Sequence, residues 1–132
     1  MAKNFAGISK SLTIAVIADE ATVTGLLLTG MGERNKKGDT NFLIVTKDTT
    51  LHHIENAFKN YTEREDVGIL LISQTVAEMI RNLIAEYEGI VPTVLEIPSK
   101  DAPYEAEKDS ILIKAARILY GGDAAEAKLR GD

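Results

Sequence analysis

Four short apolar runs, rich in β-branched residues, alternate along the chain with segments whose apolar residues recur at helical spacing. The runs occupy residues 12–18, 42–45, 67–72 and 91–97. Such a run is typical of a buried strand, and a helix after each strand is the connection that parallel strands require. The pattern therefore predicts an α/β fold: a four-stranded, parallel, doubly wound sheet of the Rossmann-like or flavodoxin-like kind, with helices on both faces and right-handed crossovers.

The ends of the expected helices carry recognisable signals. Asp19 and Glu20 stand at the start of the first helix, where an acidic side chain caps free backbone N–H groups. Gly30 and Gly32 stand at its end, where glycine adopts the left-handed conformation that closes a helix. The three expected crossover helices run from Asp19 to Met31, from a cap at Thr49 or Thr50 to Tyr61, and from Val76 to Tyr87, stopping at Gly89.

Length, charge and cysteine content narrow the possible functions. The chain has 132 residues, enough for one domain, and 45% of them are hydrophobic, so one core can form. The net charge of −5 disfavours nucleic acid and an anionic membrane face as partners. The absence of cysteine excludes a disulfide framework, a Cys-ligated zinc and a thiol nucleophile. We find no signal peptide and no apolar run long enough to cross a bilayer, so we expect a cytoplasmic chain without direct membrane insertion.

The residues after the fourth strand differ in character from the core. Pro92 near the start of that strand and Pro98 just after it indicate either a place at the sheet edge or a tight exit from the sheet. We divide the chain into a core over residues 1–97, a proline-containing linker over 98–107, a separate helix over 108–120 and a frayed tail over 121–132. Asp109 or Ser110 is expected to cap the separate helix.

This last helix carries one continuous apolar stripe. The stripe has helical spacing and consists of Ile111, Leu112, Ala115, Ile118 and Leu119. Two interpretations fit it about equally: the stripe covers the edge of the chain's own sheet, or it docks on another protein. Three crossover helices already suffice for the sheet, so this helix is additional. We take the five stripe residues, with the neighbouring Arg117, as the candidate partner-binding residues.

Catalytic chemistry is to be expected at the carboxyl ends of the strands, where doubly wound sheets bind ligands. Asp19 and Glu20 follow the first strand, and paired carboxylates hold Mg²⁺ there in receiver domains of response regulators. Such a domain needs an aspartate after its third strand, where this chain has Ser73 and Gln74. Helix capping therefore explains the two carboxylates better. A receiver-like, Mg²⁺- or nucleotide-responsive regulatory domain is the alternative function.

Other candidate sites lack the required spacing. Gly25, Gly30 and Gly32 are not followed by a Gly-Lys-Ser/Thr sequence, so they predict no phosphate loop. His52 and His53 are adjacent, so on a helix they point about 100° apart and cannot chelate one metal ion together. We therefore predict no catalytic residue, no metal site and no cofactor.

Several longer segments resemble a known family. The most specific is Pro92-Thr-Val-Leu-Glu-Ile-Pro-Ser-Lys-Asp101, followed by Lys108-Asp-Ser-Ile-Leu112; Ile17-Ala-Asp-Glu20 and Ile69-Leu-Leu-Ile-Ser-Gln74 are similar as well. Together these segments resemble the F subunits of the eukaryotic V-type ATPases, from about residue 13 to residue 119. The chain departs from the family pattern at Ala21, Thr75 and Glu105.

The resemblance implies a function that the residues alone do not give. In this family, the F subunit is a non-catalytic part of the central rotor stalk. It binds the coiled-coil D subunit and turns inside the catalytic head as ATP is hydrolysed and protons are pumped. The C-terminal segment packs along the D subunit, which favours docking for the stripe from Ile111 to Leu119. The implied location is the cytosolic face of vacuoles or other acidic compartments. A free-standing adaptor that binds a different helix through the same stripe is a third hypothesis.

Overall fold

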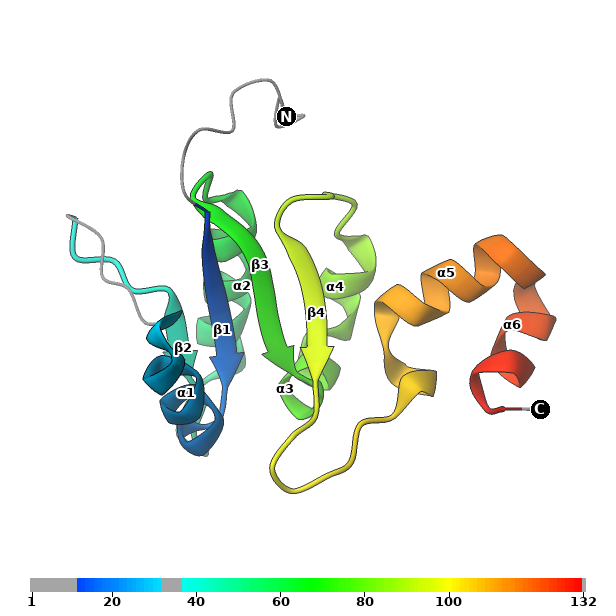
Figure 1. The fold of residues 1–132 in the computed structure, drawn as a ribbon, viewed down its shortest axis with the longest axis horizontal. Helices are drawn as coiled ribbons and strands as arrows, with labels where there is room; N and C mark the ends of the chain where they lie inside the picture. The colour runs from blue at the N-terminus through cyan, green and yellow to red at the C-terminus, as the bar shows by residue number, and fades with distance from the viewer. Residues whose placement is uncertain (1–11, 32–36, 132) are drawn as a thin grey trace.

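The centre of the computed structural model, which describes residues 12–31 and 37–131, is a sheet of four parallel strands (Figure 1). The strands are β1 (Thr13–Ala18), β2 (Phe42–Ile44), β3 (Val67–Ser73) and β4 (Thr93–Ile97), in the spatial order β2-β1-β3-β4. β1 pairs with β2 and β3, and β4 pairs with β3, all in parallel. The predicted four-stranded parallel sheet is confirmed, and β4 lies at an edge, which is one of the two positions that its prolines indicated.

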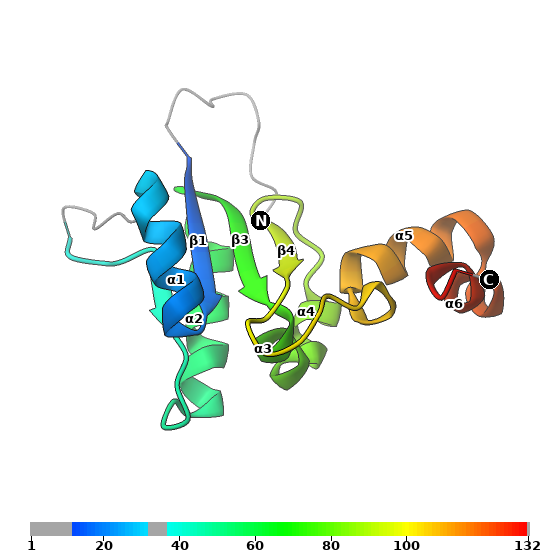
Figure 2. The same cartoon turned by 60° about the horizontal axis from the view of Figure 1, so that its bottom comes forward.

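Helices cover both faces of this sheet. α1 (Glu20–Leu26) lies on one face, and α2 (Leu51–Glu63), α3 (Gln74–Met79) and α4 (Arg81–Glu86) lie on the other (Figures 1 and 2). Successive residues of a strand point to opposite faces, so β1 contributes to two cores. Ile17 belongs to the core under α2, α3 and α4, whereas Val16 and Ala18 belong to the core with Val23 of α1. The doubly wound arrangement is thereby confirmed.

The helix caps follow the sequence signals. Asp19 accepts a hydrogen bond from the backbone of the first turn of α1 at 3.1 Å, and Thr50 does the same for α2 at 3.2 Å. α1 continues into a π-helical turn, η2 (Leu27–Met31), in which Gly30 adopts a φ of 91° and ends the helical conformation. Only glycine adopts this backbone region without strain. Gly32 lies outside the described residues.

The third crossover differs from the single helix that the spacing predicts. It consists of α3 and α4, separated by Ile80, whose φ of −120° and ψ of 30° lie outside the helical range. Ile80 is buried in the core, and the next residue, Arg81, is paired with Glu96 of β4. These tertiary contacts decide the backbone here more strongly than helix propensity does.

The C-terminal region contains more helix than expected. After a 3-10 turn, η3 (Ala106–Lys108), come α5 (Ser110–Tyr120) and α6 (Gly122–Leu129). The tail from Gly121 was predicted to be frayed, but its alanine-rich sequence favours helix, and α6 packs against α5. Both helices lie beyond β4, outside the sheet (Figures 1 and 2). Among the described residues, none of the helices is both long enough and apolar enough to cross a bilayer.

Candidate functional site

α5 presents the predicted apolar stripe to solvent. The helix begins after Asp109, whose side chain accepts a hydrogen bond from the Ile111 backbone N–H at 3.0 Å, so the predicted cap is confirmed. It then extends away from the edge strand β4 (Figures 1 and 2). Ile118 and Leu119 are 84% and 72% exposed. The exposed members of the stripe are Ile111, Leu112, Ala115, Ile118 and Leu119. Apolar side chains gathered on one exposed helix are typical of an interaction surface.

α6 covers a different side of α5. Ala116 of α5 and Ala125 of α6 are both buried where the two helices pack together. Arg117 lines a cavity of about 170 Å³ with Ile113 of α5 and Leu129 of α6. Arg117, which the sequence analysis groups with the stripe, is exposed and borders this cavity. α6 thus leaves the five stripe residues exposed while it buries the small side chain of Ala116.

A buried acidic side chain joins α5 to the core. The Glu96 side chain on β4 is 2% exposed, and its Oε2 accepts a hydrogen bond from the Ser110 backbone N–H at 2.8 Å. Its Oε1 pairs with Nη1 of Arg81 at 2.5 Å. The same nitrogen of Arg81 donates to the Ser110 hydroxyl at 3.0 Å. We call Glu96, Arg81 and Ser110 the root clamp, because together they hold the first residue of α5.

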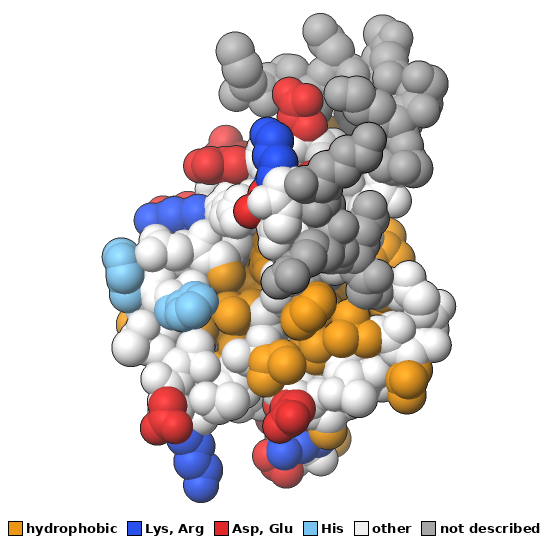
Figure 3. Space-filling view, turned by 90° about the vertical axis from the view of Figure 1, so that its left-hand side faces the viewer, with side chains coloured by type: hydrophobic (Ala, Val, Ile, Leu, Met, Phe, Trp, Pro, Cys, Tyr) orange, Lys and Arg blue, Asp and Glu red, His pale blue; other side chains and the backbone are white. Residues whose placement is uncertain are grey.

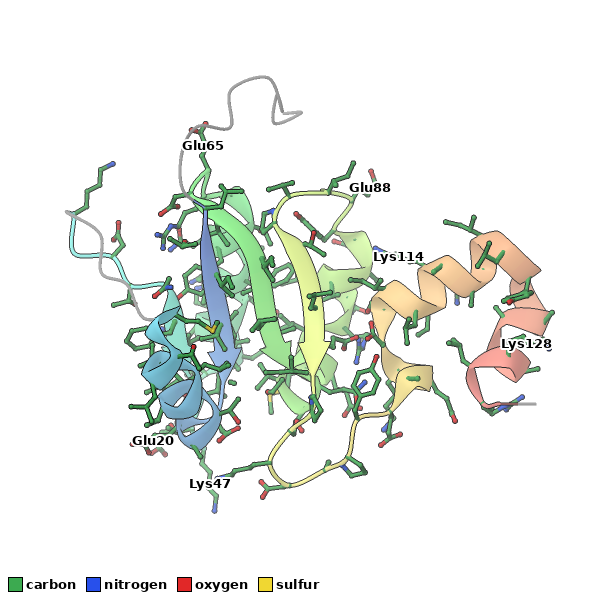
Figure 4. All side chains as sticks on the ribbon, viewed as in Figure 1. Glu20, Lys47, Glu65, Glu88, Lys114 and Lys128 are labelled. Atoms are coloured by element: carbon green, nitrogen blue, oxygen red, sulfur yellow. The ribbon has the colours of Figure 1, made fainter. Side chains whose placement is uncertain are left out.

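Two further contacts fix the chain on either side of the root clamp. Before it, the side-chain amide of Gln74 donates to the Glu105 carbonyl and accepts from the Glu105 N–H, both at 2.7 Å. After it, Lys114 of α5 reaches back toward the core (Figure 4) and donates from Nζ to the Tyr87 carbonyl at 3.0 Å. Hydrogen bonds from β4, α3 and the end of α4 thus converge on residues 105–114.

The pKa values of Glu96 and Tyr104, at the start of α5, are shifted by burial and by neighbouring groups. Burial raises the pKa of Glu96, and the hydrogen bonds from Ser110 and Arg81 offset part of that rise. Tyr104 donates its hydroxyl to Asp109, and burial together with this carboxylate raises the pKa of Tyr104. A carboxylate as buried as that of Glu96 is tolerated when it is paired and hydrogen-bonded, which Arg81 and Ser110 provide.

The contact between α5 and the core is polar and does not form a packed apolar layer. A cavity of about 540 Å³ lies between the start of α5 and the core. Its walls include Ile90 and Thr93 from the α4–β4 region and Ile111 from α5. Ile111 remains 38% exposed at the mouth of this gap. The position of α5 therefore depends on the hydrogen bonds around residue 110 more than on buried apolar area.

The carboxyl ends of the strands serve local structure. Both carboxylate oxygens of Asp19 accept hydrogen bonds from Thr22, at 2.6 and 3.1 Å. Burial acts to raise the pKa of Asp19, but the bonds from Thr22 outweigh it and lower the pKa. Gln74, after β3, is engaged with the Glu105 backbone. Within residues 12–31 and 37–131, no group of three or more metal-ligating side chains is assembled. The receiver-like alternative gains no support from this edge of the sheet.

The two histidines lie at the surface of the molecule (pale blue in Figure 3). Both belong to α2, and His52 places its Nε2 atom 3.0 Å from the Asn56 side-chain amide nitrogen. Both side chains are exposed on the helix surface.

Comparison with known proteins identifies the family. The sequence model of a family described as "ATP synthase (F/14-kDa) subunit" matches residues 14–114. The chain belongs to this family. The matched span ends within α5, so it includes the root clamp but neither Ile118 nor Leu119.

The curated relatives carry the name that the sequence resemblance suggested. The F subunit of the V-type proton ATPase of Homo sapiens is 55% identical over 110 residues, which cover 83% of this chain and 92% of that protein. That of Dictyostelium discoideum is 49% identical over 111 residues, 84% of this chain and 92% of that protein. The probable F subunit of the Caenorhabditis elegans V-type proton ATPase is 51% identical over 118 residues, which cover 89% of this chain and 98% of that protein. The resemblance is therefore confirmed. Among solved structures, the F subunit of the V-type ATP synthase from Archaeoglobus fulgidus matches with a TM-score of 0.45 and 22% identity, covering 66% of this chain and 98% of that chain.

Proposed function

We propose that the chain is a non-catalytic rotor component in the central stalk of a V-type proton ATPase. It binds the coiled-coil D subunit, and through that protein it helps to couple ATP hydrolysis in the catalytic head to proton pumping. Membership of the family and the names of the relatives support the assignment to this complex. The proposed location is the cytosolic face of a vacuolar or other acidic-compartment membrane, where the chain is held by the other proteins of the complex.

The observation that carries the proposed binding to the D subunit is the exposed stripe on α5. Ile111, Leu112, Ile118 and Leu119 are each at least 36% exposed, so an approaching helix finds apolar area that the core does not use. Fully burying a side chain of this size contributes about 1.5–3 kcal/mol. Because these four are between 36% and 84% exposed, covering what remains of them contributes about 3–7 kcal/mol before ordering costs are subtracted. A helix laid along a coiled coil forms a desolvated seam of this kind.

Truncation at a defined point of α5 tests this proposal. A chain that ends at Lys114 keeps the residues of the root clamp and Lys114 itself, but lacks Ala115, Ile118 and Leu119. We expect its core to unfold at nearly the same temperature as the full chain, because the two core clusters do not include α5 or α6. Its affinity for the purified D subunit, measured by isothermal titration calorimetry, should fall strongly.

Two results would count against the proposal. Wild-type affinity of the shortened chain for the D subunit would exclude docking through the C-terminal half of α5. Saturable NMR shifts on addition of Mg²⁺ or a nucleotide, confined to Asp19, Glu20 and Ser73, would instead favour the receiver-like alternative.

A further inference from the structure

The direction of α5 is defined by very few contacts. The helix packs against α6 and η3, which belong to the same C-terminal region, and a cavity of about 540 Å³ lies between its first turn and the α4–β4 region of the core. Its large apolar residues Ile118 and Leu119 stay exposed. Apolar packing is non-directional and is nearly absent here, so it does not explain why α5 leaves the core at one angle.

We propose that the root clamp sets the direction of α5, so that α5 and α6, here called the arm, turn with the core as one body. The clamp is a conformational device of this chain alone, and the inference holds whatever partner the arm binds.

The geometry of the two anchors supports this role. Ser110 and Lys114 are four residues apart, so they lie on the same face of α5, one turn from each other. Ser110 is bound to Glu96 and Arg81, and Lys114 is bound to the Tyr87 carbonyl. Two fixed points along one helical face define the direction of the helix axis.

Ser110 is the more constrained of these anchors. Its backbone N–H meets a carboxylate whose side chain is 2% exposed, whereas the Lys114 hydrogen bond is exposed to solvent. Hydrogen bonds are directional, and a charge-assisted bond to a buried carboxylate is stronger than a neutral one in water. If α5 moved away from the core, Glu96 would lose the Ser110 N–H as a hydrogen-bond donor, and because its side chain is buried, water would not replace that donor.

A single substitution removes this donor and leaves the helix able to form. Ser110 is the first residue of α5, a position where proline is favoured. The proline ring fixes φ at a helical value, and the N–H that proline lacks would have no partner inside the helix. The preceding residue, Asp109, is extended, with φ −75° and ψ 116°, as a residue before proline prefers. Ser110→Pro therefore deletes the N–H to Glu96. Ser110→Ala is the matched control for this donor: it removes the hydroxyl that accepts from Arg81, but it keeps the N–H to Glu96 and leaves Arg81 paired with Glu96.

Distances between spin labels report the direction of the arm in the full chain. The chain has no cysteine, so labels are confined to introduced ones. Glu65→Cys on the core and Lys128→Cys on α6 form the core–arm pair, and Glu65→Cys with Lys47→Cys forms a pair within the core (Figure 4). Pulsed electron–electron double resonance gives the distance distribution of each pair.

We expect a single narrow core–arm peak for the unsubstituted chain and for Ser110→Ala, and loss of that peak to a broad distribution for Ser110→Pro. Glu96→Gln, which leaves one acceptor oxygen for two donors, should broaden it as well. The core pair should be unchanged throughout. A narrow, unshifted core–arm peak in both Ser110→Pro and Glu96→Gln overturns the proposal. Equal broadening of the core pair overturns it too, because the whole fold would then be loosened.

Discussion

A charge introduced at Ile118 should weaken binding to the D subunit without affecting the fold. Ile118 is 84% exposed, so almost its whole side chain is available to a partner and almost none of it stabilises the chain itself. Loss of its burial removes about 1.5–3 kcal/mol, and an unpaired carboxylate in an apolar seam adds a desolvation penalty. Since about 1.4 kcal/mol corresponds to a factor of ten, Ile118→Asp should raise the Kd for the D subunit at least ~10-fold.

Leu28 provides the matched control for this measurement. It is an apolar residue that is 85% exposed, in η2 at the opposite side of the molecule from α5 (Figure 1). Leu28→Asp should leave the Kd unchanged in the same calorimetric titration. Both variants should unfold in urea within about 0.5 kcal/mol of the parent, as expected for surface substitutions. Wild-type affinity of Ile118→Asp would refute the reasoning, as would equal weakening by the two variants.

Two predictions concern the core. The pKa of Asp19 is lowered in the folded chain, so its charged form contributes stability above the ordinary value of 3.8, and this contribution is lost as the pH falls below it. Asp19→Ala should therefore lower the free energy of unfolding by about 1 kcal/mol at pH 7 and by less at pH 3, and an equal deficit at both pH values would contradict the capping role. Gly25→Ala should stabilise α1 by about 0.5–1 kcal/mol, because an added Cβ meets nothing within 4 Å. Gly30→Ala should destabilise the chain by about 1–2 kcal/mol, because the φ of Gly30 is 91°. A change in the free energy of unfolding in urea that has the same sign for both substitutions would contradict this argument.

The sequence predicted the sheet well because its signals are local. Each strand is a run of apolar residues between polar ones, and the caps at Asp19 and Thr50 lie next to the helices that they begin. Pro92 and Pro98 left an edge position and a tight exit open for β4, and the strand order shows the edge. Fold class therefore needed no knowledge of which residues meet in space.

The two errors in secondary structure have different causes. No glycine or proline at Ile80 marks the break between α3 and α4 in the sequence. The break depends on the burial of Ile80 and on the ion pair of Arg81 with Glu96, which cannot be read from the sequence. α6 could have been predicted, because alanine, glutamate, lysine and leucine are strong helix formers. The small and charged residues of that segment suggest a frayed end, whereas in the structure Ala125 is buried where α6 packs on α5.

The root clamp was missed although one signal was present. Glu96 is the acidic residue of a short, mainly apolar strand, and a buried carboxylate requires a partner. The sequence does not show which residues are its partners, because Arg81 and Ser110 lie 15 and 14 positions away along the chain and meet Glu96 only in the folded structure. The stripe on α5 was predicted by spacing, but its exposure could not be, because spacing does not say which surface a stripe faces.

A polar anchor and an exposed apolar stripe suit each other. If the residues from Ile111 to Leu119 packed on the sheet, they would fix α5 but would have to be released before a partner could bury them. With Ser110 and Lys114 as anchors, the helix is oriented by hydrogen bonds and its apolar area stays available. A buried ion pair adds little net stability compared with apolar residues of the same volume. The place of Glu96 in β4 is therefore best understood by the helix that it orients, whose exposed stripe is the proposed binding surface for the D subunit.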